Sequence, residues 1–226
     1  MWRTARPFAD RRDAGRFLAA QLGGYAKKDP VCAALPRGGV VVAAEVASLF
    51  GAAIDVIVAG KLRSPGNPEL AIGAVTEDGE VYLNREIISY LGVSKPYLEQ
   101  EKADRLKVVS AKLGRYRQVI AKTPLTGRCV ILIDDGLATG STMIAAIQAT
   151  HAAGASEIIV AVPGGPADTV ERIKAMPEVT GVVCPVMPDD FSAVSQLYED
   201  FRQIEDEEVV EILKTFASGR RPGGPR

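Results

Sequence analysis

Short, nearly continuous apolar runs alternate along the chain with segments in which apolar residues recur every three or four positions. The runs are typical of strands buried on both faces of a parallel sheet, and the periodic segments are typical of helices that cover such a sheet. The alternation predicts an α/β fold with a mostly parallel central sheet flanked by helices. Strands are predicted at residues 31–35, 54–59, 130–133, 158–162 and 179–183, and helices at 11–22, 40–50, 94–120, 143–152 and 166–176.

The pattern changes between residues 60 and 84, where glycine, proline and alternating apolar positions replace the long runs. Residues 70–75 and 80–83 flank Glu77-Asp78-Gly79, a sequence typical of a tight turn, and together they predict a hairpin. A hairpin at this place could cover a site, and Glu69 within it either orients a substrate or is simply solvated. The predicted helix that follows has an apolar stripe made of Leu106, Val109, Leu113, Tyr116 and Ile120.

Length and composition favour one enzyme-sized domain. We expect that domain to cover residues 1–217 of the 226, and the residues rich in Gly, Pro and Arg at 218–226 to form a disordered tail. Lys and Arg number 27 against 28 Asp and Glu, and no long basic run is present, so we expect neither nucleic-acid nor membrane binding. The chain has no apolar run long enough for a bilayer and no signal-peptide pattern, so a cytoplasmic location is expected.

The cysteines and the single histidine predict no metal site. Cys32, Cys129 and Cys184 are widely spaced and lie in or beside predicted strands, so we expect small buried hydrophobic side chains rather than disulfides or metal ligands. His151 stands alone near the end of a predicted helix, without the partner spacing of a metal centre.

The most informative chemistry lies at residues 130–142, where a buried strand is followed by Asp134 and Asp135 and then by a loop of small residues that opens a helix. Ligands of open α/β sheets bind at the carboxyl ends of the strands. Backbone amides at a helix start hold phosphate, and ionised carboxylates accept hydrogen bonds from a vicinal diol. The alternative is a polar turn with helix-capping hydroxyls. The residues predicted to hold a phosphate are Ala138, Thr139, Gly140, Ser141 and Thr142.

A second loop of this kind follows the first predicted strand. Arg37 is a forked donor suited to phosphate oxygens, and Gly38 and Gly39 would let backbone amides approach an anion closely. In isolation the same residues are equally compatible with a tight strand-to-helix turn and a surface arginine. Lys61 follows the second predicted strand and is a further candidate cation, with Arg63 a weaker one.

Residues 130–142 resemble the signature of the type I phosphoribosyltransferases, in which an apolar strand leads into two acidic residues and a phosphate loop. Residues 8–15 and 35–39 extend the resemblance to bacterial stand-alone phosphoribosyltransferase-like proteins. The resemblance implies the type I phosphoribosyltransferase fold, with a flexible hairpin lid and a small hood made from about residues 184–213 and the N-terminal segment.

The resemblance also implies a reaction and a set of roles. Ribose 5-phosphate would pass from phosphoribosyl pyrophosphate to a nitrogen acceptor, with release of pyrophosphate and inversion at the anomeric carbon. Asp134 and Asp135 would bind the ribose, and residues 138–142 the 5-phosphate. Arg37, Gly38, Gly39 and Lys61 would bind the pyrophosphate, with Arg37 and Lys61 catalytic. Mg²⁺ would be bound mainly through substrate oxygens and water, and a homodimer is compatible with the family.

The acceptor is less well defined by the sequence. Purine-salvage members of the family commonly carry an aspartate at the position of Ala138, and a methyl group cannot act as acid or base, so we expect an acceptor that is not a purine. Phe191, Tyr198 and Phe201 of the predicted hood could stack on a planar ring, although aromatic residues at this spacing are more often core. The alternative function is a non-catalytic regulatory protein that binds phosphoribosyl pyrophosphate or a nucleotide.

Overall fold

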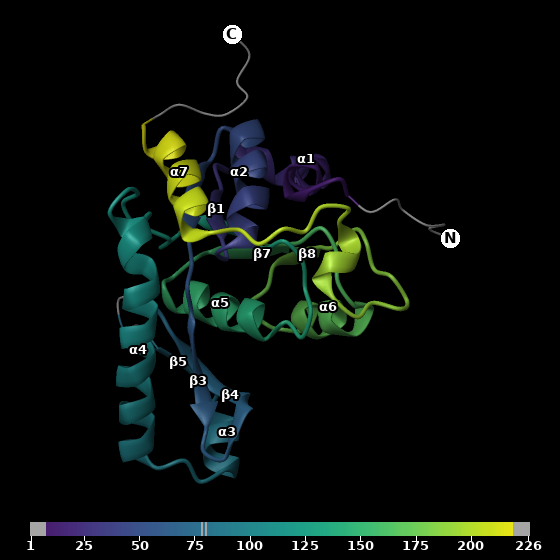
Figure 1. Ribbon diagram of the computed structural model, residues 1–226. Helices are drawn as coiled ribbons and strands as arrows, with labels where there is room; N and C mark the ends of the chain where they lie inside the picture. The colour runs from purple at the N-terminus through teal and green to yellow at the C-terminus, as the bar shows by residue number, and fades with distance from the viewer. Residues whose placement is uncertain (1–7, 78, 80, 219–226) are drawn as a thin grey trace.

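The computed structural model describes residues 8–77, 79 and 81–218 (Figure 1). Its centre is a five-stranded sheet with the order β2-β1-β6-β7-β8, and every neighbouring pair of strands is parallel. The prediction of an α/β fold with a parallel sheet is confirmed. The strands are β1 (Val31–Ala34), β2 (Ala53–Val56), β6 (Cys129–Ile133), β7 (Glu157–Ala161) and β8 (Gly181–Val183).

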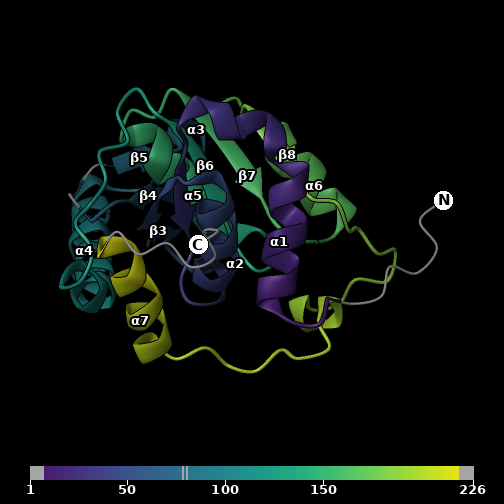
Figure 2. The same cartoon turned by 90° about the horizontal axis from the view of Figure 1, so that it is seen from above.

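The apolar runs form strands because both faces of the sheet are covered. Side chains alternate along β6, so Ile131 and Ile133 enter one core and Val130 and Leu132 enter the other. One face packs against the helices α1 (Arg11–Gln21), α2 (Gly38–Phe50), α4 (Lys95–Arg117) and α7 (Asp206–Ala217), and Figure 2 shows α1, α2 and α7 over the sheet. The other face packs against α5 (Ser141–Ala152) and α6 (Ala167–Lys174).

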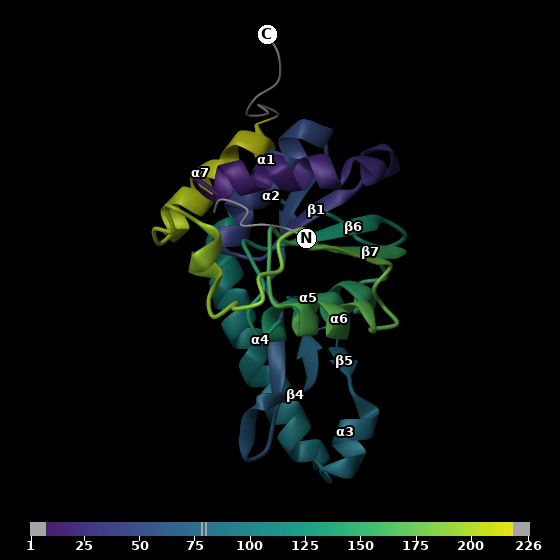
Figure 3. The same ribbon diagram turned by 90° about the vertical axis from the view of Figure 1, so that its right-hand side faces the viewer.

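The predicted hairpin is part of a three-stranded antiparallel sheet made of β3 (Gly60–Ser64), β4 (Asn67–Val75) and β5 (Val81–Leu83). Together with the short helix α3 (Arg85–Tyr90) and the first half of α4, this sheet forms an arm that extends below the body (Figures 1 and 3). The arm has a small core of its own around Leu62, Ile72 and Val75. The strands of the predicted hairpin are confirmed, whereas β3 and α3 were missed. Asp78 of the predicted turn and the side chain of Glu69 lie outside the described residues.

The predicted long helix is shared between the two cores. Val109, Leu113 and Tyr116 are buried in the body, whereas Leu106 packs in the core of the arm. At the end of α4, Arg117 donates to the buried Asp55 of β2 at 2.6 Å and to Glu77 of the arm at 2.6 Å. Asp55 also accepts from the backbone N–H of Thr123 at 2.8 Å, so this ion network fixes the root of the arm to the body.

Two short 3-10 helices, η1 (Gly23–Lys28) and η2 (Val194–Leu197), lie in the connections. The cysteines are free and buried as expected, and burial raises the pKa of Cys32 to about 12. Within residues 8–77, 79 and 81–218, no helix is both long enough and apolar enough to cross a membrane. Most of the predicted tail lies outside the described residues, because only Ser218 of it falls within them.

Candidate active site

The two candidate loops lie side by side because β1 and β6 are neighbours. The backbone N–H of Leu35, just after β1, donates to the carbonyl oxygen of Ile133 at the end of β6 at 2.9 Å. The peptide bond between Pro36 and Arg37 is cis. The carboxyl ends of parallel strands thus bring together two segments that are about a hundred residues apart in sequence, as the fold class predicts.

The first turn of α2 packs directly on the acidic pair. A Cβ atom on Gly38 would lie 1.9 Å from Oδ2 of Asp135, and one on Gly39 would lie 2.7 Å from the carbonyl oxygen of Ile133 and 3.0 Å from Oδ1 of Asp134. Real Cβ atoms do not approach so closely, so the two glycines are needed for contact between the loops. This packing is a structural reason for both glycines, and it acts alongside the phosphate contact expected from the sequence.

The two carboxylates have different surroundings. Oδ2 of Asp135 accepts from Nε of Arg11 at 2.7 Å, whereas Oδ1 of Asp134 accepts from the backbone N–H of Asp135 at 2.8 Å. Burial, followed by the negative charge of Asp135, raises the pKa of Asp134 well above that of an ordinary aspartate. The carboxylates are therefore not interchangeable in this structure.

The predicted phosphate loop reaches α5 through Gly140, whose φ of +72° is a backbone conformation that suits glycine. Gly140 has no side chain to cap α5, and the N–H of Ser141 makes only a long contact of 3.5 Å with Oγ1 of Thr139, so the amides at the start of α5 can bind an anion. The hydroxyls of Thr139 and Ser141 lie 3.1 Å apart.

Two residues of α6 form hydrogen bonds to the same loop. The hydroxyl of Thr169 donates to the carbonyl oxygen of Ala138 at 3.2 Å, and Nη2 of Arg172 donates to the carbonyl oxygen of Thr139. These contacts tie two carbonyl oxygens of the phosphate loop to α6. No local sequence pattern indicates either contact, because both depend on how α6 packs.

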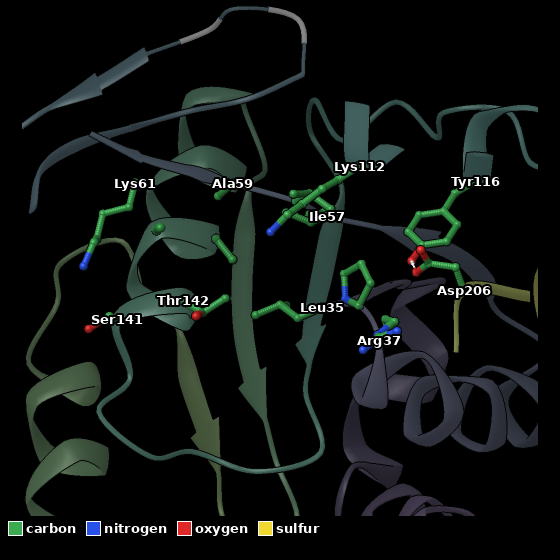
Figure 4. Close-up of a pocket in the computed structure, with 14 residues that line it drawn as sticks. Leu35, Arg37, Ile57, Ala59, Lys61, Lys112, Tyr116, Ser141, Thr142 and Asp206 are labelled. Atoms are coloured by element: carbon green, nitrogen blue, oxygen red, sulfur yellow. Dashed lines mark hydrogen bonds between the residues drawn. The ribbon is translucent and has the colours of Figure 1, made fainter. Parts of the chain in front are cut away.

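A cavity of about 520 Å³ opens between the two loops and the root of the arm (Figure 4). Four of the predicted residues line it, namely Arg37, Lys61, Ser141 and Thr142. The other predicted residues do not line this cavity; they are Asp134, Asp135, Gly38, Gly39, Ala138, Thr139 and Gly140.

The cavity also has a wall that the sequence analysis missed, formed by Lys112 and Tyr116 of α4 and Asp206 of α7. In Figure 4, Lys61 and Ser141 lie at one end of the cavity, Arg37, Tyr116 and Asp206 lie at the other, and Lys112 points between them. Tyr116 was predicted only as part of an apolar stripe. A lysine beside such a stripe is common on exposed helices, so its sequence position carries no information about a cavity.

Helix α7 contributes two acidic residues at this end. Oε2 of Glu205 accepts from Nη1 of Arg37 at 3.0 Å, and Oδ1 of Asp206 accepts from the hydroxyl of Tyr116 at 2.6 Å. Burial, together with the hydrogen bond to Asp206, raises the pKa of Tyr116. The acidic run at 205–208 is typical of a helix start, but α7 was not among the predicted helices.

Comparison with known proteins settles the family. The model of the phosphoribosyl transferase domain matches residues 9–201. The chain belongs to this family. The match includes both loops and all the residues predicted to bind substrate, and it confirms the resemblance and the fold class inferred from the motifs.

Relatives of this phosphoribosyl transferase family member include two curated proteins from Mycobacterium tuberculosis, strains CDC 1551 and H37Rv, each named "Putative phosphoribosyl transferase". Each is 42% identical over 206 residues, which cover 91% of this chain and 46% of the relative. The chain thus spans about half the length of the curated relatives it matches. The crystal structure of a protein from Thermus thermophilus is also similar, with 43% identity and a TM-score of 0.87 over 92% of this chain and 98% of that one.

The other side chains considered in the sequence as substrate contacts of this phosphoribosyl transferase domain, Arg63 and the hood aromatics, pack against or pair with other residues of the protein. Nε of Arg63 donates to the buried Glu101 at 2.9 Å, and this pair joins the arm to α4. In the hood, Tyr198 is buried and stacks on Phe201 at 5.1 Å between ring centroids, and Phe191 packs on the same small core. The interpretation of these aromatics as core residues is confirmed. Among the described residues, no three His, Cys, Asp or Glu side chains gather as ligands for a metal ion.

Proposed function

We propose that this protein transfers ribose 5-phosphate from phosphoribosyl pyrophosphate to a nitrogen acceptor and releases pyrophosphate. One observation carries the proposal: the start of α5 and Lys61 lie at one end of the cavity, Arg37 lies at the other, and Lys112 points between them. Its volume of about 520 Å³ is within the usual range for small-molecule sites. A substrate with a phosphate at one end and a pyrophosphate further along would match these charges.

The proposed roles follow from where charge is bound and where it develops. The amides and hydroxyls at Ser141 and Thr142 would hold the 5-phosphate, with Ala138, Thr139 and Gly140 shaping the loop. As the bond from the anomeric carbon to pyrophosphate breaks, the leaving group gains negative charge, which Arg37 and Lys61 would stabilise. The acceptor nitrogen forms its new bond on the opposite face of the ribose.

The chain fits a magnesium ion that is held mainly by its substrate. Magnesium binds oxygen, retains several waters and often takes its ligands from phosphate groups. Asp134, directly after β6, is a carboxylate that could accept a hydrogen bond from a metal-bound water. When bound, the ion would neutralise pyrophosphate charge.

We propose an acceptor other than a purine. Ala138 is exposed on the phosphate loop, and its methyl group can neither give nor take a proton. The hood aromatics Tyr198 and Phe201 are occupied by packing on each other and on Arg11, so they do not form a ready stacking site for a base. A non-catalytic protein that binds the same substrate is the second possible outcome of the experiment below.

The decisive experiment is isothermal calorimetry with phosphoribosyl pyrophosphate, with and without Mg²⁺, followed by a pyrophosphate-release assay with a panel of purines, pyrimidines and other nitrogen compounds. Binding with release supports the transferase. Binding without release for every acceptor supports the regulatory protein, and absence of binding rejects both.

Matched variants assign the roles. Lys61→Met should lower the release rate, whereas Lys95→Met, an equal loss of charge at an exposed position on the far end of α4, should leave it unchanged. Arg37→Ala should weaken the binding of inorganic pyrophosphate more than that of ribose 5-phosphate. Equal losses for the two ligands would mean that Arg37 is structural.

A further inference from the structure

The buried ion pair between Arg11 and Asp135 joins parts of the chain that are 124 residues apart. The Arg11 Nε to Asp135 Oδ2 distance is 2.7 Å, and the side chains are only 8% and 15% exposed. Arg11 is the first residue of α1, and Asp135 is the second acid after β6. One of the two acids predicted to bind ribose is therefore already paired with a cation inside the protein.

Arg11 is held in place from other directions as well. Its Nη1 donates to the carbonyl oxygen of Arg202 at 2.8 Å. Its guanidinium carbon lies 4.0 Å from the ring centroid of Phe201 and 5.7 Å from that of Tyr198. A guanidinium held by cation–π contacts and by hydrogen bonds to two partners has little freedom to turn toward a substrate.

Asp135 is similarly constrained on its backbone and its side chain. Its carbonyl oxygen accepts from the hydroxyl of Tyr198 at 2.5 Å. Its carboxylate lies against the first turn of α2, where a Cβ atom on Gly38 would meet Oδ2 at 1.9 Å and Nε of Arg11 at 2.9 Å. Asp135 thus lies at the junction of α1, the hood and the first turn of α2.

Asp134 has a different position in the same loop. Its Oδ1 accepts from the N–H of Asp135, and none of the described Lys or Arg side chains forms an ion pair with it. Fixing Asp135 therefore fixes the backbone that carries Asp134 and leads into the phosphate loop. The two adjacent acids are suited to different tasks.

We propose that Arg11 and Asp135 are positioning residues, and that Asp134 is the carboxylate that binds the ribose hydroxyls. The Arg11–Asp135 pair acts through the backbone by holding the loop after β6 against the first turn of α2, so that the 5-phosphate and pyrophosphate sites keep a fixed separation. This division of roles rests on the proposed function and narrows it, because the sequence alone assigned both acids to the ribose.

The test uses the full chain as wild type and as three variants: Asp134→Asn, Asp135→Asn and the double variant Arg11→Gln/Asp135→Asn. Calorimetry measures binding of phosphoribosyl pyrophosphate with Mg²⁺, and thermal unfolding reports on the fold. Asp134→Asn should weaken binding by roughly 10- to 100-fold, the value of one charge-assisted hydrogen bond, and should not lower the unfolding temperature, because it removes a buried charge.

Asp135→Asn alone should lower both the unfolding temperature and the affinity, because it leaves a buried arginine without its counter-charge. The double variant replaces the ion pair with two neutral side chains that can hydrogen-bond to each other. It should recover affinity to within about threefold of wild type, since a neutral pair of similar volume can replace a buried ion pair. Recovery of affinity separates positioning from ligand binding, because a residue that binds ribose through its charge cannot be rescued by changing Arg11.

A folded double variant that binds as weakly as Asp134→Asn would make Asp135 a direct ribose ligand and would overturn the division of roles. The division of roles is also overturned if Asp134→Asn binds phosphoribosyl pyrophosphate as tightly as wild type. Wild-type protein that binds no phosphoribosyl pyrophosphate would instead reject the proposed function itself, so the two failures are distinguishable.

Discussion

Replacing Gly38 by alanine tests whether the contact between the two loops stabilises the fold. The added methyl group would lie 1.9 Å from Oδ2 of Asp135 and 2.9 Å from Nε of Arg11, so either the ion pair or the first turn of α2 must move. Separating a buried ion pair costs about 3–5 kcal/mol, and alanine in place of glycine in a helix returns about 1 kcal/mol. We therefore expect Gly38→Ala to lower the free energy of unfolding by about 2–4 kcal/mol.

For a chain of this size, about 1 kcal/mol corresponds to 2–4 °C in Tm, so scanning calorimetry should show a decrease of about 4–16 °C. Gly114→Ala is the matched control, because Gly114 lies on the exposed side of α4 and a Cβ atom there meets nothing within 4 Å. It should raise Tm by about 2–4 °C. If Gly38→Ala unfolds at or above the wild-type temperature while the control behaves as expected, the first turn of α2 does not depend on glycine and the reasoning is refuted.

Three other outcomes are expected. Burial raises the pKa of Asp134, so affinity for phosphoribosyl pyrophosphate should rise as the pH rises from the ordinary aspartate pKa of 3.8 through the raised pKa of Asp134. Over the same interval, ionisation of Asp134 should lower the stability of the free protein. Calorimetry at several pH values should show the rise in affinity, and Asp134→Asn should flatten it. Glu205→Gln should lower the KM for this substrate by no more than about fivefold in steady-state kinetics, because the ion pair with Arg37 is exposed and worth about 1 kcal/mol or less. An unchanged or higher KM would mean that Glu205 does not compete with the substrate for Arg37. Unaltered protein should transfer little to hypoxanthine or guanine and Ala138→Asp should transfer more, whereas efficient purine transfer by the wild type would contradict the role given to Ala138.

The sequence predicted the central sheet well because the burial of its strands is visible in their composition. Residues 130–133 are apolar at every position, and all are buried, since helices cover both faces of the sheet. The acids and small residues that follow such a strand fall at the carboxyl edge for geometric reasons, and family membership supports the motif. Local pattern was sufficient for these features.

Other features depend on tertiary contacts and could not be predicted in this way. Strand β3 reads Gly-Lys-Leu-Arg-Ser and has one large apolar residue, so its extended form depends on pairing with β4, where the register also shifts twice. The Arg11–Asp135 pair joins residues 124 positions apart, and no spacing rule connects them. Lys112 reaches the cavity only because α4 runs past the ends of the central strands.

The two cores that share α4 have a mechanical consequence. The helix is continuous over 23 residues, which at 1.5 Å per residue makes a rod about 35 Å long. The arm packs along its first half, and Arg117 ties its last residue to Asp55. A tilt of about 5° around that tether would move the far end by about 3 Å and Lys112, one to two turns from the tether, by less than about 1 Å. If the arm tilts about this tether, the geometry of α4 therefore converts a large movement at its tip into a small displacement of Lys112.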